Sequence, residues 1–172
     1  MTDAIVHSER LILTPHRTDD LRDCAAMWAD PSVTRMIGGK PCSEEEVWTK
    51  ILRHKGHWEL LGFGYWVARE KASGRFVGEV GLADLKRQIV PSFAGAPEIG
   101  WALPPWAWGK GFATEAARAA LGWFETHRGR ARTVCMINPD NAASIRVAEK
   151  CGYREWQRSI YLSGKVVLFQ RD

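Results

Sequence analysis

Two glycines, one residue apart, mark the segment of this chain with the clearest chemical meaning. Gly109 and Gly111 lie between the prolines at 104–105 and an alanine-rich stretch that begins at Phe112. Glycine lets a backbone adopt positive φ and come close to a ligand. A helix start leaves N–H groups unpaired and carries a partial positive charge. Together these features predict a cradle for an anion, typically a phosphate group.

The spacing around these glycines does not match the common nucleotide motifs. A P-loop requires a hydroxyl residue after its lysine, but Lys110 is followed by Gly111, and no glycine lies five positions before Gly109. In a dinucleotide fingerprint the third glycine position would be Thr114, and no acidic residue follows at the distance that a ribose contact needs. Taken alone, the segment is compatible with either a phosphate site or a structural loop.

A second motif lies downstream, where Asn141-Ala-Ala-Ser144 is followed by Glu-Lys-Cys-Gly-Tyr at 149–153. With the glycine loop, this order resembles the GNAT superfamily of acetyl-CoA-dependent N-acetyltransferases. The similarity is to its Rim-type branch, named for N-terminal acetylation of ribosomal proteins. That branch joins a strand ending Glu-Ile-Gly-aromatic to Trp-Gly-Lys-Gly-aromatic-Ala-Thr-Glu-Ala. The chain has both, at 98–101 and 108–116, and its segment 10–15 looks like the first strand of the branch.

The resemblance implies an α/β GNAT fold. This means a single, mixed, mostly antiparallel sheet of about six to seven strands, flanked by about four helices. A length of 172 residues, 45% hydrophobic and 26% charged, suits one soluble domain with one sizeable core, here residues 1–172. There is no internal repeat or linker.

Local signals place the elements. Ser43 and Glu46 form a capping box, which starts a helix reaching about residue 60. Gly152 is a helix stop. Strands are expected at about 10–14, 63–69, 75–84, 97–103, 133–137, 153–162 and 165–171, and further helices from 18–20 to 28, at 112–126 and at 141–151. Ser163-Gly164 is expected to be the turn of the last hairpin.

The resemblance implies acetyl transfer from the CoA thioester to a primary amine by direct attack in a ternary complex. Acetyl-CoA is therefore the expected cofactor. Its pyrophosphate would lie on the loop and helix start, its pantetheine arm along the strand that begins at Glu98, and a backbone N–H near Trp101 would polarise the thioester carbonyl. The expected cofactor-binding residues are Trp101, Ala102, Leu103, Trp108, Gly109, Lys110, Gly111, Phe112, Ala113, Thr114 and Asn141.

Two residues are predicted to be catalytic, Glu98 and Ser144. Glu98 would take the proton of the amine, through water, with Glu79 as the second choice of base. The family's tyrosine acid is replaced by Ala148, and Ser144 would lie near the sulfur in its place. A thiol has a pKa of about 8.5, so its thiolate leaves with little acid help. Without a catalytic role, Glu98 and Glu79 would be solvated carboxylates at strand ends, and Ser144 would be a residue of the first helical turn. Asn141 can both cap its helix and contact CoA.

Some alternatives stay open. Trp106 replaces the Gln or Arg that the family has before its glycines, and both Trp106 and Trp108 fit either packing or cofactor contact. A non-catalytic CoA or acyl-CoA sensor is the alternative function: Ala148 favours it, whereas Glu98 and Ser144 oppose it. A ribosome-bound structural protein has only the basic balance in its favour.

The remaining expectations concern surroundings. No signal segment and no long apolar run is visible, which predicts a cytoplasmic protein without membrane contact. The four cysteines are expected to be free, mostly buried thiols, and His54 and His57 lack further ligands for a metal.

The net charge of +4 needs no nucleic acid partner, because CoA is itself a polyanion. The chain is expected to be a monomer or a homodimer. The amine is not encoded in any signature of the segments expected to receive it, 18–60 and 156–167.

Overall fold

The structure of the protein is a computed structural model that describes residues 4–172. One sheet of eight strands runs through it in the order β1-β2-β3-β4-β5-β6-β8-β7. This confirms the expected α/β GNAT fold, but the described residues hold eight strands and five α-helices, slightly more than expected. Two short elements account for the excess: β1 (Val6–His7) and α2 (Pro31–Thr34), which are too short to leave a periodic pattern in the sequence.

The first part of the sheet is antiparallel and contains β2 (Leu11–Pro15), β3 (Tyr65–Glu70), β4 (Phe76–Ala83) and β5 (Glu98–Ala102). Strand β6 (Thr133–Ile137) then lies parallel to β5, and β8 (Gly164–Arg171) and β7 (Arg154–Tyr161) complete the sheet. The predicted strands are all found, with ends that differ by one or two residues.

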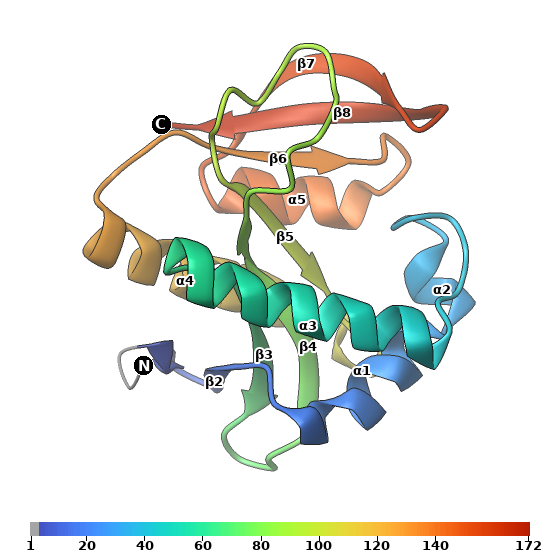
Figure 1. The fold of residues 1–172 in the computed structure, drawn as a ribbon, viewed down its shortest axis with the longest axis vertical. Helices are drawn as coiled ribbons and strands as arrows, with labels where there is room; N and C mark the ends of the chain where they lie inside the picture. Colours follow the sequence, from blue (N-terminus) through green and yellow to red (C-terminus); the bar gives the residue numbers. More distant parts are fainter. Residues whose placement is uncertain (1–3) are drawn as a thin grey trace.

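The helices cover both faces of the sheet. Helix α3 (Glu44–Leu61) crosses one face and α4 (Phe112–Arg128) crosses the other (Figure 1). Helix α1 (Leu21–Trp28) packs beside α3, and α5 (Ala142–Lys150) beside α4. The predicted capping box at Ser43 and Glu46 is confirmed, as is the stop at Gly152, which has φ +86°. The two faces are called below the α3 face and the α4 face.

Strand alternation gives each face its own core, because successive side chains point to opposite sides of a sheet. On β4, Val80 and Leu82 belong to the cluster that packs under α4, together with its alanines and Phe124. The α3 face has a separate cluster, built on Met27, Trp28, Val33, Val47, Ile51, Val67 and Ala102. Glu79, which alternates with Val80, therefore lies on the α3 face.

The last hairpin corrects one expectation. The turn residues are Leu162 and Ser163, both in the left-handed region with φ +47° and +65°, and Gly164 already begins β8. Two consecutive positive φ values match the twist of a two-residue hairpin. The predicted turn, Ser163-Gly164, was one residue too late, because glycine is the residue that usually marks such turns.

Candidate functional site

The sheet opens between β5 and β6. These strands share one paired position, Glu98 with Val134, where the Val134 N–H donates to the Pro97 carbonyl at 3.0 Å. Because neighbouring residues of a strand direct their backbone groups to opposite sides, Ile99 and Trp101 face β6 as Pro97 does. The pairing does not continue, so the N–H and C=O of Trp101 face the gap without a ladder partner among residues 4–172.

A cavity of about 890 Å³ passes through this gap. On the α3 face it is lined by Trp28, His54, Tyr65 and Glu98. On the α4 face it reaches Trp101 and the start of α5, ending at Asn138, Asn141 and Ser144. The sheet thus brings the predicted base and the predicted serine to one cavity, from opposite faces.

The glycine loop follows β5 and a short 3₁₀ turn, Pro105–Ala107. Gly109 has φ +71° and Gly111 φ +80°, which only glycine adopts at little cost. Within residues 4–172, the backbone N–H groups of residues 109–114 make no hydrogen bond; the first N–H of this helix to do so is that of Glu115, which bonds to the Gly111 carbonyl at 3.1 Å. A run of free N–H groups at the start of a 17-residue helix is the geometry that the predicted anion cradle requires.

Arg10 holds this loop in place. Its guanidinium donates to the Lys110 carbonyl at 2.9 Å and to the Glu115 carboxylate at 2.7 Å, and it covers the Phe112 ring at 4.5 Å. Ser8 adds a 2.7 Å hydrogen bond to the same carboxylate. Glu115 thus links the N-terminal segment to the start of α4.

The two tryptophans of the loop have different environments. Trp106 donates to the Phe76 carbonyl at 3.1 Å and lies under Arg75 and Lys110, so it packs beneath the loop. Trp108 donates to the Leu103 carbonyl at 2.7 Å but keeps 47% of its surface exposed beside the cradle.

At the start of α5 the two predicted polar residues are joined. Asn141 is the N-cap and accepts the Ser144 N–H at 3.1 Å. The Trp101 indole N–H donates to the Ser144 hydroxyl oxygen at 3.3 Å. Since the hydroxyl oxygen accepts this bond, its own proton is left to be donated into the cavity.

Glu98, 8% exposed, is held by a cation. Arg87 donates to both of its carboxylate oxygens, at 2.5 and 2.9 Å, and also covers the Tyr161 ring at 5.0 Å. Arg87 lies in the loop between β4 and β5, which has no regular structure and gave no signal in the sequence. A guanidinium keeps its charge at all ordinary pH, so Arg87 gives Glu98 a permanent cationic partner at the wall of the cavity.

Glu79 lies deeper, at 2% exposure, and its carboxylate accepts hydrogen bonds from the His16 ring and from the Trp28 indole, the latter at 2.5 Å. Burial alone would raise the pKa of Glu79; the hydrogen bond and positive charge of the His16 ring outweigh it, so the pKa falls below its ordinary value. Three donors, the His16 ring, the Trp28 indole and the Cys24 thiol, surround this deeply buried carboxylate, so Glu79 serves as an anchor of the fold.

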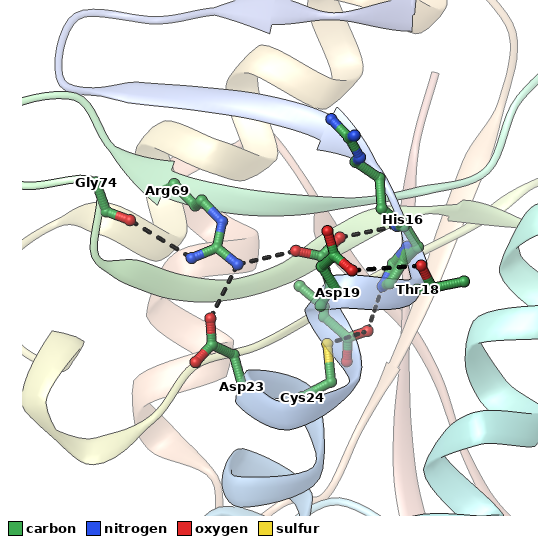
Figure 2. A network of polar contacts seen from close by, with 10 residues as sticks. His16, Thr18, Asp19, Asp23, Cys24, Arg69 and Gly74 are labelled. Atoms are coloured by element: carbon green, nitrogen blue, oxygen red, sulfur yellow. Dashed lines mark hydrogen bonds and ion pairs between the residues drawn. The ribbon is translucent and has the colours of Figure 1, made fainter.

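The surrounding polar network ties α1 to the sheet. Arg69 of β3 donates to Asp20 at 2.8 Å and to Asp23 at 2.9 Å. Figure 2 shows Arg69 between Gly74 and Asp23, with Cys24 and His16 close by at the start of α1. This network leaves no local pattern in the sequence, because its members are scattered from residue 16 to residue 79.

Three members of the network, His16, Cys24 and Glu79, bring potential metal-ligating atoms within 4.8 Å of one another. The Cys24 thiol lies 3.6 Å from the Glu79 carboxylate as a hydrogen-bond donor. Burial, and then the charge of Glu79, raise the pKa of this thiol far above its ordinary value. A protonated thiol is a poor ligand, so the set fits a buried polar cluster better than a metal centre, although the Nδ1 atom of His16 has no hydrogen-bond partner in residues 4–172.

A stack of rings extends from this network to the cavity. The His54 ring lies 4.8 Å from His16 and 4.5 Å from Tyr65. Tyr65 lies across Gly81 and Gly100, where a Cβ on Gly100 would stand 2.2 Å from its hydroxyl oxygen. Burial raises the pKa of Tyr65, so the hydroxyl stays protonated and can donate. Sequence reasoning missed Tyr65; the pair of glycines, one on each neighbouring strand, was the available signal.

Known proteins resemble this chain along most of its length. Residues 10–154 match the family described as acetyltransferase (GNAT) domain. The uncharacterized protein YkkB of Bacillus subtilis is 36% identical over 145 residues, covering 78% of each chain. The FsC-acetyl coenzyme A-N(2)-transacetylase of Aspergillus fumigatus is 31% identical over 153 residues, which span 86% of this chain and 63% of that protein.

Solved structures share the whole fold. A putative GnaT-family acetyltransferase from Bordetella pertussis superposes with a TM-score of 0.86 at 27% identity, over 98% of this chain and 99% of that one. RimL, a ribosomal L7/L12 alpha-N-protein acetyltransferase in complex with coenzyme A, superposes with a TM-score of 0.79 at 16% identity, over 97% of each chain. In the described residues, no helix is long and apolar enough to cross a bilayer.

Proposed function

The chain belongs to the GNAT acetyltransferase family. We propose that it transfers the acetyl group of acetyl-CoA to a primary amine within the cavity that crosses the β5–β6 gap, with CoA as the leaving group. GNAT acetyltransferases use acetyl-CoA, and the general activity, N-acetyl transfer, follows from the family. One observation carries the assignment of the site: a single cavity joins Glu98 on one face of the sheet to Ser144 on the other, through an interruption of the pairing.

The cofactor is proposed to bind on the α4 face. The free N–H groups of residues 109–114 would receive its pyrophosphate, and the exposed Trp108 would border it. The unpaired backbone of Trp101 would align the pantetheine arm as a missing strand does, with Ala102 and Leu103 alongside and Asn141 at the far wall. In that position the Trp101 N–H is the donor that would polarise the thioester carbonyl.

The acceptor is proposed to enter from the α3 face. A primary amine is mostly protonated near neutral pH, so it must lose a proton before it attacks. Glu98 is the proposed base, acting directly or through one water, because it lines the cavity at the gap and the one hydrogen-bonding partner of its carboxylate within residues 4–172, Arg87, lines the same cavity. Glu79, with three donors around it, is not proposed as a base.

The leaving thiolate is proposed to be stabilised by a hydrogen bond from the Ser144 hydroxyl on the α4 face. Its hydroxyl proton is free while Trp101 donates to its oxygen. The motifs that match the Rim-type branch make protein N-termini the first acceptors to test.

Release of free thiol from acetyl-CoA, measured with a panel of amines and N-terminal peptides, tests this function. The E98Q variant should lose about 10²-fold to 10³-fold in kcat on any accepted amine, with CoA affinity nearly unchanged. The matched control is R87Q, which breaks the same ion pair but keeps the carboxylate, and it should lose tenfold at most. Equal losses in both variants would mean that Glu98 acts only through its ion pair, and full activity of E98Q would remove it from the mechanism.

A further inference from the structure

The wall of the cavity carries a marked excess of positive charge. Three carboxylates line it, Glu79, Asp84 and Glu98, against six cationic side chains: Arg35, Lys50, Arg53, Lys86, Arg87 and Lys165. The whole chain is far closer to balance, with 24 basic and 20 acidic residues. The cavity wall thus has three more cations than carboxylates, whereas the whole chain has only four more.

Each of these carboxylates already has a partner of its own. Glu98 is paired with Arg87, Asp84 with Lys86 at 2.6 Å, and Glu79 accepts from His16 and Trp28. A polyamine, which carries further positive charges besides its reacting ammonium, would therefore find no unpaired carboxylate for them on this wall. For such an acceptor the site offers desolvation and repulsion without compensation.

The six cations differ in whether they have a partner. Lys50 lies 4.7 Å over the Trp28 ring, which can hold its charge without an anion. Arg35, Arg53 and Lys165 have no ion pair with any residue in the described range 4–172. Unpaired cations that converge on a cavity are what recognition of an anionic ligand requires.

These three unpaired cations lie on three different elements, at the part of the cavity where the acceptor is proposed to enter. Arg35 caps α2, Arg53 projects from α3, and Lys165 begins the part of β8 next to the hairpin turn. The segment after α2 and the β7–β8 turn lie on the same side of the molecule (Figure 1), and both line the cavity. The cofactor cradle at 109–114 is outside this lining, so these cations are not part of the proposed pyrophosphate site.

We infer that the acceptor is an amine that carries carboxylates close to its amino group: an acidic N-terminal segment or an acidic amino acid, rather than a polyamine. This inference rests on the proposed function, because it places the acceptor on the α3 face. The same cations would favour loss of the ammonium proton, since neighbouring positive charge lowers the pKa of an amine. Substrate recognition and activation of the nucleophile would then come from one set of charges.

The test compares four acceptors: an N-terminal peptide with Asp and Glu at its second and third positions, the same peptide with Asn and Gln there, free glutamate, and spermidine. Binding to the CoA-loaded protein is measured by calorimetry, and turnover by thiol release. The acidic peptide or glutamate should bind about tenfold more tightly than the amide peptide, with a difference that shrinks as salt rises. Tighter binding of the acidic peptide than of glutamate would identify the acceptor as a chain end, and tighter binding of glutamate would identify it as a free amino acid.

The double variant R35Q/R53Q should lose most of this preference, while its affinity for CoA stays unchanged. The matched control is K55Q, which removes an exposed cation from the same helix outside the cavity lining and should keep the preference. Equal binding of the acidic and amide peptides, tighter binding of spermidine, or a preference that survives in R35Q/R53Q would overturn the inference. Selective binding without turnover would count against the proposed function alone, and turnover without selectivity against the inference alone.

Discussion

The two faces of the sheet are built on different principles. On the α4 face the site is made from backbone: free N–H groups at 109–114 and the unpaired strand edge at Trp101, over an apolar core. On the α3 face it is made from side chains, with a buried polar network around Glu79 and cations around the cavity. A backbone site suits a ligand that every family member shares, whereas a side-chain site can be changed residue by residue.

The α4 face and the α3 face are also stabilised by different kinds of interaction. Under α4, close packing of alanines and large apolar residues needs no polar partner. Under α1 and α3, a charged carboxylate is buried and its cost is offset by three donors, His16 after β2 and Cys24 and Trp28 on α1. The α3 face should therefore be the more sensitive to loss of a single polar group and to acid.

The largest effect is expected from exchanging side chains of similar volume on one strand. E79M leaves the Trp28 indole and the His16 ring buried without their acceptor, and should cost about 3 kcal/mol of unfolding free energy. L82M, on the same strand but facing α4, replaces one apolar side chain by another and should cost less than about 1.5 kcal/mol. Urea unfolding of the two variants measures both values, and equal costs would erase the distinction between the faces.

A smaller effect is expected on acidification. Burial lowers the pKa of His54 from 6.5 to about 3, so the folded protein keeps this ring neutral while the unfolded chain protonates it. Unfolding therefore takes up a proton in this window, and stability should fall as the pH drops below about 6.5, by up to about 1.4 kcal/mol per pH unit.

The source of that pH dependence can be isolated. H54F should flatten the stability profile between pH 6.5 and 4.5, because the phenyl ring can keep the stack on Tyr65 without titrating. H127F replaces an exposed ring stacked on Trp123 of α4 and should leave the profile unchanged. A profile that stays as steep in H54F would place the acid-sensitive group elsewhere.

The smallest effect tests the cradle. At Gly109 and Gly129, near the two ends of α4, a Cβ would meet no atom within 4 Å, and both have positive φ. G109A and G129A should each lose about 1 to 2 kcal/mol of stability from backbone strain. Only G109A should also weaken CoA binding, by about tenfold, since only its N–H belongs to the proposed cradle. Calorimetric titration of both variants decides whether the loop binds CoA or is only a turn.

The sequence predicted the α4 face better than the α3 face for a physical reason. The glycines, the helix start and Asn141 with Ser144 are contiguous motifs, because backbone geometry is set by neighbours along the chain. The structure also brings Glu98 and Ser144 to one cavity, while their catalytic roles stay predictions. The partner of Glu98 was not foreseen, since Arg87 reaches it from an irregular loop.

The α3 face escaped prediction because its contacts join distant segments. His16, His54, Tyr65 and Glu79 are brought together by strand register and by the position of α3, neither of which leaves a local pattern. Even the cations that line the cavity were visible only as part of a mildly basic composition. Their significance depends on which of them lack a partner, and that is a property of the folded chain.

The division of the two faces is tested most directly by hydrogen–deuterium exchange of the backbone amides with and without CoA. The amides of residues 109–114 have no partner within the described chain and should exchange rapidly in the free protein. With CoA bound, these amides and that of Trp101 should slow markedly, while the α3 amides that line the acceptor side keep their rates. Unchanged exchange at 109–114 in the presence of saturating CoA, or protection confined to α2 and α3, would contradict the account.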